Sequence, residues 1–156
     1  FGPLSYHGGS VWPHDTAIAV RGLAADGHYG VAASFVRGLL ATATAFEHRL
    51  PELFSGVQAG GGLTPYPYPP ACRPQAWSAA SSVALLGSAL GLRPDVPAGT
   101  LDLRPMAPSP VGALTVSGLR VAGQEFRVGL AADGAVVDVA APPSLRLTAP
   151  RLTAGT

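Results

Sequence analysis

The chain has 156 residues, the length of one ordinary domain or of a piece of a larger one. Its ten Lys and Arg residues and nine Asp and Glu residues leave a net charge of +1, which excludes the basic footprint of a nucleic-acid-binding protein. A single cysteine excludes a disulfide-stabilised scaffold. Charged residues make up only 12% of the chain, against about 25% in a typical soluble domain. This shortage predicts that part of the surface packs against further protein.

Membrane and targeting signals are not apparent in the sequence. It contains no run of 18 apolar residues and opens with no signal peptide, so we expect no membrane contact and a cytoplasmic location. The first residue is Phe1 rather than Met, which fits a fragment or a processed chain.

The first half of the sequence predicts three helices, over residues 15–25, 29–47 and 74–91. Pro13 suits a first helical turn, where its missing N–H would be unpaired in any case. The second segment carries apolar residues at spacings of three and four, which indicates one apolar stripe along a helix. The same pattern in the third segment includes Trp77, for which it predicts a core position.

A long irregular stretch, residues 48–73, separates the second and third predicted helices. It is rich in Gly and Pro, and it holds Glu52, Tyr66 and other aromatic residues. Long loops over a compact scaffold are usually functional or disordered. A carboxylate among aromatic residues favours a binding rim.

The second half of the sequence changes its period. Residues 94–113 read as an extended, proline-punctuated connection. From residue 114 onward apolar residues alternate with small or polar ones, and Asp133-Gly134 is a hairpin signal. The pattern predicts an antiparallel sheet of about three strands. The last fifteen residues, 142–156, predict a flexible tail.

Two segments hold the residues that could carry chemistry. Residues 6–15 (YHGGSVWPHD) gather His7, Trp12, His14 and Asp15. A Trp face can stack on a pyranose ring while His and Asp bind its hydroxyls, which favours a sugar site. The alternative is a buried Trp with Asp15 as a helix cap. The histidine spacing matches no zinc motif, so we expect no metal.

Glu52 lies in the second segment, residues 50–54 (LPELF), beside a rigid proline. Its functional interpretation is a general base that activates water in an aromatic cleft. The alternative is an ordinary solvated loop carboxylate. Gln75, at the start of the third helix, either caps that helix or reaches the cleft, and Cys72 is expected to be a small buried residue.

Three blocks occur in order: residues 6–15, residues 50–54 and residues 71–78 (ACRPQAWS). Together they resemble the C-terminal part of bacterial glycogen-debranching-type amylo-α-1,6-glucosidases. Those enzymes belong with glucoamylase-like and mannosylglycerate-hydrolase-like proteins built on an (α/α)6 barrel. The resemblance runs from about residue 6 to residue 104 and continues more weakly through residue 121.

The resemblance implies a mainly α fold, the C-terminal portion of such a barrel with about three helices, followed by a small antiparallel β-sheet. It divides the chain into a partial barrel (residues 1–104), a β segment (105–141) and the tail (142–156). It implies hydrolysis of α-1,6-glucosidic bonds with inversion and without a cofactor. The substrate would be an oligosaccharide or α-glucan.

The resemblance also implies roles for single residues. The family's general base falls on Glu52, and its sugar-lining Trp and His-Asp fall on Trp12, His14 and Asp15. His7, Tyr66 and Gln75 complete the candidate sugar contacts. The family's general acid lies in a Gly-Arg-Asp block, which does not occur in this sequence. The chain is therefore expected to be inactive alone, with the N-terminal part of the barrel as its partner.

Three alternatives remain open. The same fold could act on mannosylglycerate or trehalose, because loops set the specificity. The chain could be a non-catalytic carbohydrate-binding module, or a module that complements a separate segment carrying the acid. It could also be a truncated product whose helices expose apolar faces and aggregate.

Overall fold

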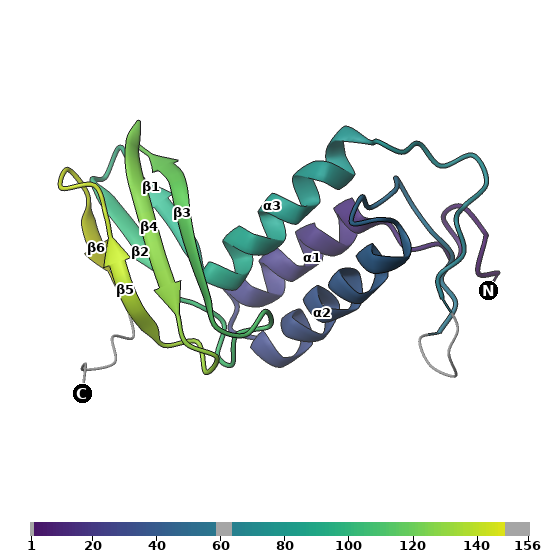
Figure 1. Ribbon diagram of the computed structural model, residues 1–156, viewed down its shortest axis with the longest axis horizontal. Helices are drawn as coiled ribbons and strands as arrows, with labels where there is room; N and C mark the ends of the chain where they lie inside the picture. The colour runs from purple at the N-terminus through teal and green to yellow at the C-terminus, as the bar shows by residue number, and fades with distance from the viewer. Residues whose placement is uncertain (1, 59–63, 149–156) are drawn as a thin grey trace.

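The structure is a computed structural model that describes residues 2–58 and 64–148. These residues form three helices and then six strands, which build a helical layer and a β-sandwich at opposite ends of the molecule (Figure 1). The helices are α1 (Pro13–Ala25), α2 (Tyr29–Ala45) and α3 (Ala76–Leu90). The strands are β1 (Leu92–Asp95), β2 (Thr100–Leu103), β3 (Leu114–Val121), β4 (Gln124–Leu130), β5 (Val136–Ala140) and β6 (Arg146–Thr148).

The expected fold class, a mainly α portion of an (α/α)6 barrel, is wrong. The protein is an α+β fold, and in the described part of the chain three helices precede two sheets of three strands each. The residues that the sequence assigned to a connection form β1 and β2, which pair antiparallel. Pro94 is tolerated there because β1 lies at the edge of its sheet, where a missing N–H breaks no second ladder.

The helical layer is built around α1, which packs against both α2 and α3. Small residues on its buried face, among them Ala17 and Ala24, allow the neighbouring helices to approach closely. The three expected helices are confirmed, with α2 ending two residues earlier than predicted. Glu47 and His48 have positive φ angles of 54° and 59°, which are incompatible with a continuing helix.

The end of α3 is confirmed at the predicted glycine. Gly91 has a left-handed φ of 59°, and its N–H donates to carbonyls of the last helical turn. The backbone then passes directly into β1 at Leu92, so one residue joins the helical layer to the sandwich. This tight joint fixes the direction of α3 relative to the strands.

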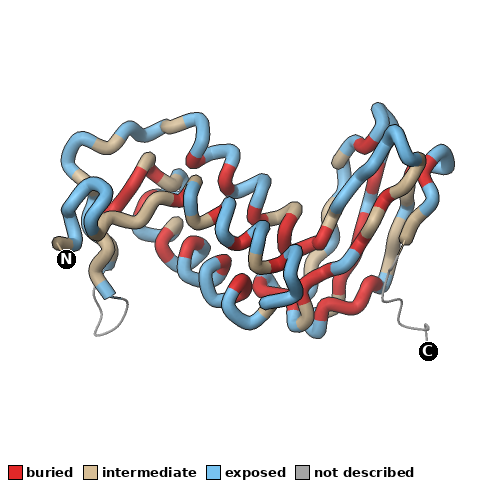
Figure 2. Tube along the Cα trace, turned by 180° about the vertical axis from the view of Figure 1, so that it is seen from behind, coloured by how far each residue is buried: buried red, intermediate tan, exposed pale blue. Residues whose placement is uncertain are grey.

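The apolar stripes predicted for the helices are only partly buried (Figure 2). In α2 the buried side chains include Ala33, Val36 and Leu39, whereas Phe35 is 43% exposed. The reason is that α1 covers only part of the surface of α2, so Phe35 and Leu40 stay outside while Val36 and Leu39 are buried. Trp77 is 42% exposed, so the expectation that it is a core residue is wrong.

The sandwich consists of an antiparallel sheet, β3-β4-β5, and a mixed sheet, β1-β2-β6, in which β2 and β6 are parallel. The predicted three-stranded sheet and its turn at Asp133-Gly134 are confirmed. Leu101 and Leu103 of β2 belong to the sandwich core, so the expected boundary at residue 105 falls inside this unit. Strand β6 lies within the expected tail, whose residues 149–156 are outside the described part of the chain.

Candidate active site

The three sequence blocks meet at the end of the helical layer that points away from the sandwich (Figure 1). Val11 and Phe54 exchange two backbone hydrogen bonds, of 2.9 and 3.0 Å, and Phe54 also forms a bridge with Pro67. Ser55 and Tyr66 continue this pairing, because the Ser55 N–H donates to the Tyr66 carbonyl at 2.9 Å. We call these three paired segments, around residues 11, 54–55 and 66–67, the ribbon. The ribbon lies next to the N-terminal ends of α1 and α3.

An aromatic cluster fills this end of the layer. We define it as the rings that stack or meet edge to face there: Tyr6, His7, Trp12, His14, Tyr68 and Trp77. His7 stacks on Trp12 with ring centres 5.5 Å apart, and His14 stacks on Trp77 at 5.3 Å. Trp12 and Trp77 meet edge to face at 6.2 Å. The two tryptophans therefore connect α1 with α3.

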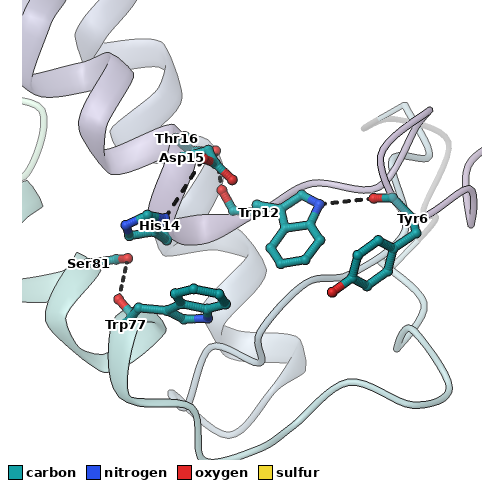
Figure 3. A network of polar contacts seen from close by, with 7 residues as sticks. All are labelled: Tyr6, Trp12, His14, Asp15, Thr16, Trp77 and Ser81. Atoms are coloured by element: carbon teal, nitrogen blue, oxygen red, sulfur yellow. Dashed lines mark hydrogen bonds and ion pairs between the residues drawn. The ribbon is translucent and has the colours of Figure 1, made fainter.

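Polar contacts hold the cluster in place (Figure 3). The Trp12 indole N–H donates to the Tyr6 carbonyl at 3.0 Å, which fixes the plane of the ring. The Thr16 hydroxyl donates to the Trp12 carbonyl at 2.8 Å. Both bonds use backbone carbonyls. Because His7 stacks on Trp12 and His14 stacks on Trp77, a ligand could use only the ring surface that remains exposed.

Glu52 lies beside this cluster on the central segment of the ribbon. Its N–H donates to the Cys72 carbonyl at 3.0 Å, and its carboxylate accepts the Cys72 N–H at 3.4 Å. Partial burial raises the pKa of the Tyr6 phenol, and the nearby charge of the Glu52 carboxylate raises that pKa further. Tyr6 is therefore a neutral hydroxyl donor close to the Glu52 carboxylate.

Asp15 does not cap α1. Trp12 occupies the N-cap position without a side-chain cap, and Asp15 lies in the first turn, where its charge suits the helix dipole. Its carboxylate lies 3.8 Å from Nδ1 of His14. Asp15 also lines a groove that runs between α1 and α2.

Tyr66 and Gln75, the remaining predicted contacts, have structural bonds. The Tyr66 N–H donates to the Ser55 hydroxyl at 2.7 Å, and its side chain is exposed. The Gln75 side-chain oxygen caps α3 by accepting the Ala76 N–H at 3.0 Å. Cys72 is exposed, so its expected burial is wrong.

Sequence reasoning missed three members of the aromatic cluster as candidate contacts. Tyr6 and Trp77 lie within the blocks that carry the resemblance, so their position in those blocks was a usable signal. Tyr68 lies outside these blocks, in the segment whose aromatic residues predicted a binding rim. Its place 5.6 Å from the Tyr6 ring follows from the pairing of the ribbon, which only the folded chain reveals.

The groove between α1 and α2 has a volume of about 860 Å³ and is lined mainly by apolar atoms. Several hydroxyls line it, but the Thr16, Ser34 and Thr44 hydroxyls donate to backbone carbonyls of their own helices or caps. Phe35 and Phe54 contribute aromatic surface. The groove thus presents mostly carbon to whatever enters it.

Within residues 2–58 and 64–148, His, Cys, Asp and Glu side chains form no group of three that could hold a metal ion. In the same residues no helix combines the length and apolar character that a membrane crossing requires. No family model and no curated protein matches the sequence. The geometry around Glu52 is therefore what supports a function.

Proposed function

We propose that the aromatic cluster binds a sugar and that Glu52 is the general base of a glycoside hydrolase of the amylo-α-1,6-glucosidase type. In this reaction a water molecule attacks the anomeric carbon of an α-glucoside, and Glu52 takes a proton from that water as the new C–O bond forms. The glycosidic C–O bond breaks at the same time, and a second carboxyl group, the general acid, protonates the departing oxygen. Two carboxyl groups and water suffice, so the proposal needs no cofactor. The observation that carries it is a backbone-held carboxylate beside exposed aromatic rings.

The composition of the cluster supports a sugar ligand. Tyr6 and Trp77 are each 42% exposed, which leaves ring surface for the apolar face of a pyranose. His7, His14 and the neutral Tyr6 hydroxyl supply donors and acceptors for sugar hydroxyls near those rings. An α-1,6-linked glucoside is the substrate implied by the resemblance of the three blocks that meet here.

The general acid is the second carboxyl group that the reaction needs. An inverting pair needs carboxyl groups roughly 6.5–9.5 Å apart. Asp15, the best internal candidate, has a 70% exposed side chain, pairs with His14 and lines the groove. We therefore propose that a partner segment carries the acid and that this chain alone binds sugar without turnover.

Intrinsic fluorescence tests the proposal directly, because both tryptophans of the chain belong to the aromatic cluster. Isomaltose, an α-1,6-linked glucose disaccharide, should change the emission in a saturable way, whereas trehalose and mannosylglycerate should bind more weakly. Trp77→Ala should weaken binding by roughly 0.5–1.5 kcal/mol, the usual range for an aromatic contact. A chain whose emission responds to none of the three sugars would contradict the proposal.

Glucose release from the same disaccharide separates binding from catalysis. The chain alone should release no glucose, and Glu52→Gln should retain binding because the amide keeps the shape of the carboxylate. Turnover by the unmodified chain that Glu52→Gln abolishes would keep Glu52 as base. It would also show that the acid lies inside the chain, with Asp15→Asn as the next variant to measure.

A second candidate function is a complementing module, and the groove supports it. Phe35 and Leu40 are exposed on α2. Phe35 lines the groove, and the Ser34 and Thr44 hydroxyls of that groove already donate to backbone carbonyls. Such a surface fits the apolar face of a protein segment better than it fits a sugar. The double variant Phe35→Ser, Leu40→Ser should reduce concentration-dependent association in sedimentation velocity and leave the sugar response unchanged. Equal association of variant and parent would count against this candidate.

A further inference from the structure

We infer that Ser78 is a positioning residue that orients Glu52 by fixing the peptide group in front of it. The inference rests on the proposed function only for the role of Glu52 as a base. The contact itself links α3 to the ribbon. The Ser78 hydroxyl, fully buried in the first turn of α3, donates to the Pro51 carbonyl at 2.8 Å.

The bond acts on the peptide group that joins Pro51 to Glu52. The carbonyl of that group accepts from Ser78, and its N–H donates to the Cys72 carbonyl at 3.0 Å. Because a peptide group is planar, fixing both polar atoms fixes the plane from which the Glu52 side chain departs. The proline ring in addition restricts φ on the other side of the carbonyl.

Cys72 provides the other hold on Glu52. Its N–H reaches the Glu52 carboxylate at 3.4 Å, so the same residue contacts both the main chain and the side chain of Glu52. The carboxylate can keep this contact only while the peptide plane keeps its orientation. Ser78 therefore controls the carboxylate through Pro51 without touching it.

The other buried serines of α3 show that this bond is unusual. Ser81 and Ser88 each donate to the carbonyl four residues earlier in their own helix, at 2.8 Å. Such a bond is common for a serine inside a helix. Ser78 instead reaches a segment 27 residues away in the sequence. Its neighbour Trp77 belongs to the aromatic cluster, so one helical turn places both the sugar-stacking ring and the base.

The test is an NMR titration of the Cys72 amide through the range in which a carboxylate takes up its proton, roughly pH 3 to 6. In the unmodified chain the Cys72 amide shift should follow protonation of Glu52, since its N–H donates to that carboxylate. Ser78→Ala should reduce or abolish this response. Ser81→Ala, which removes a similarly buried hydroxyl one turn later, should leave it intact.

Two further measurements keep the outcome clear. The Val11 and Phe54 amides should stay protected from hydrogen exchange in Ser78→Ala, because their mutual bonds do not involve α3. Loss of this protection would mean that Ser78 supports the whole ribbon, and it would overturn the inference. An undiminished Cys72 response in Ser78→Ala would also overturn it. If Ser78→Ala does not fold, Ser78→Cys keeps nearly the same volume with a weaker donor and should give a reduced response.

This titration contains no sugar, so it is independent of the proposed function. If the Ser78 variants behave as expected while the tryptophan emission responds to no sugar, the positioning contact stands and the proposed function fails. If sugar binds and the Ser78 variants match the unmodified chain, the proposed function stands and this inference fails.

Discussion

The helical layer and the β-sandwich bury their apolar side chains to different degrees. Of the twelve exposed large hydrophobic side chains among the described residues, nine lie before residue 91. The sandwich instead packs two sheets against each other and fully buries residues such as Phe126, Leu101 and Val136. A sandwich closes its own core, whereas three helices with small residues at their contacts leave outer faces uncovered. The layer that carries the candidate site is thus the one with uncovered apolar surface.

The largest expected effect comes from the sandwich core. Phe126→Ala should lower the free energy of unfolding by about 3–5 kcal/mol, because it leaves a cavity where a ring with 1% exposure packs between the sheets. Val137→Ala is the matched control, since Val137 is 58% exposed on the neighbouring strand β5 and should change stability by less than about 0.5 kcal/mol. Urea unfolding followed by circular dichroism measures both. Equal effects would contradict the closed core that distinguishes the sandwich from the helical layer.

A smaller effect is expected at the joint between the two regions. Gly91→Ala should destabilise the protein by at least roughly 1–2 kcal/mol, the cost of a left-handed conformation for a residue with a side chain. The new methyl group would in addition collide with the Arg104 carbonyl. Gly87→Ala, one turn earlier in α3, meets no atom within 4 Å and should stabilise the helix by about 0.5–1 kcal/mol. Thermal unfolding should shift in opposite directions for the two variants.

The smallest expected effect concerns Tyr6. Removing the charge in Glu52→Gln should lower the raised pKa of the Tyr6 phenol toward its ordinary value, with partial burial keeping it slightly elevated. A raised pKa in the folded state means that this group favours folding below the ordinary tyrosine pKa. That contribution is lost as the pH rises through the raised value. An NMR titration of the Tyr6 ring in both proteins checks whether this pKa falls. An unchanged Tyr6 pKa in Glu52→Gln would mean that the Glu52 carboxylate is too far from the phenol to act on it.

Local signals in the sequence predicted the elements that local chemistry determines. The glycine end of α3 and the hairpin at Asp133-Gly134 need only a residue type with the right backbone freedom. Strands β1 and β2 were not predicted, because prolines in and beside them interrupt the alternating pattern of a strand. Strand β1 forms at the edge of its sheet, where it pairs with β2. The resemblance to a helical barrel then assigned residues up to 104 to the partial barrel, although residues 92–95 and 100–103 pair as strands.

The candidate site was predictable only in part. Glu52, Trp12 and His14 stood in recognisable blocks, and the structure brings these blocks together through the ribbon. The exposure of Trp77 was not predictable, because an apolar stripe indicates a buried face only where a neighbouring element covers it. The bond from Ser78 to Pro51 was not predictable either, since its partners lie 27 residues apart with no spacing rule to connect them.

Helix α3 has a mechanical consequence for this protein. Its first turn carries Trp77 and Ser78, and its last residue, Leu90, is embedded in the core of the sandwich. At 1.5 Å per residue, its fifteen residues form a rod about 22 Å long between these points. Only Gly91 separates the end of α3 from β1, and its backbone is hydrogen-bonded. The sandwich therefore sets the direction of the helix. A small rotation of α3 relative to the sandwich would therefore displace Trp77 by a distance that grows with the length of the helix.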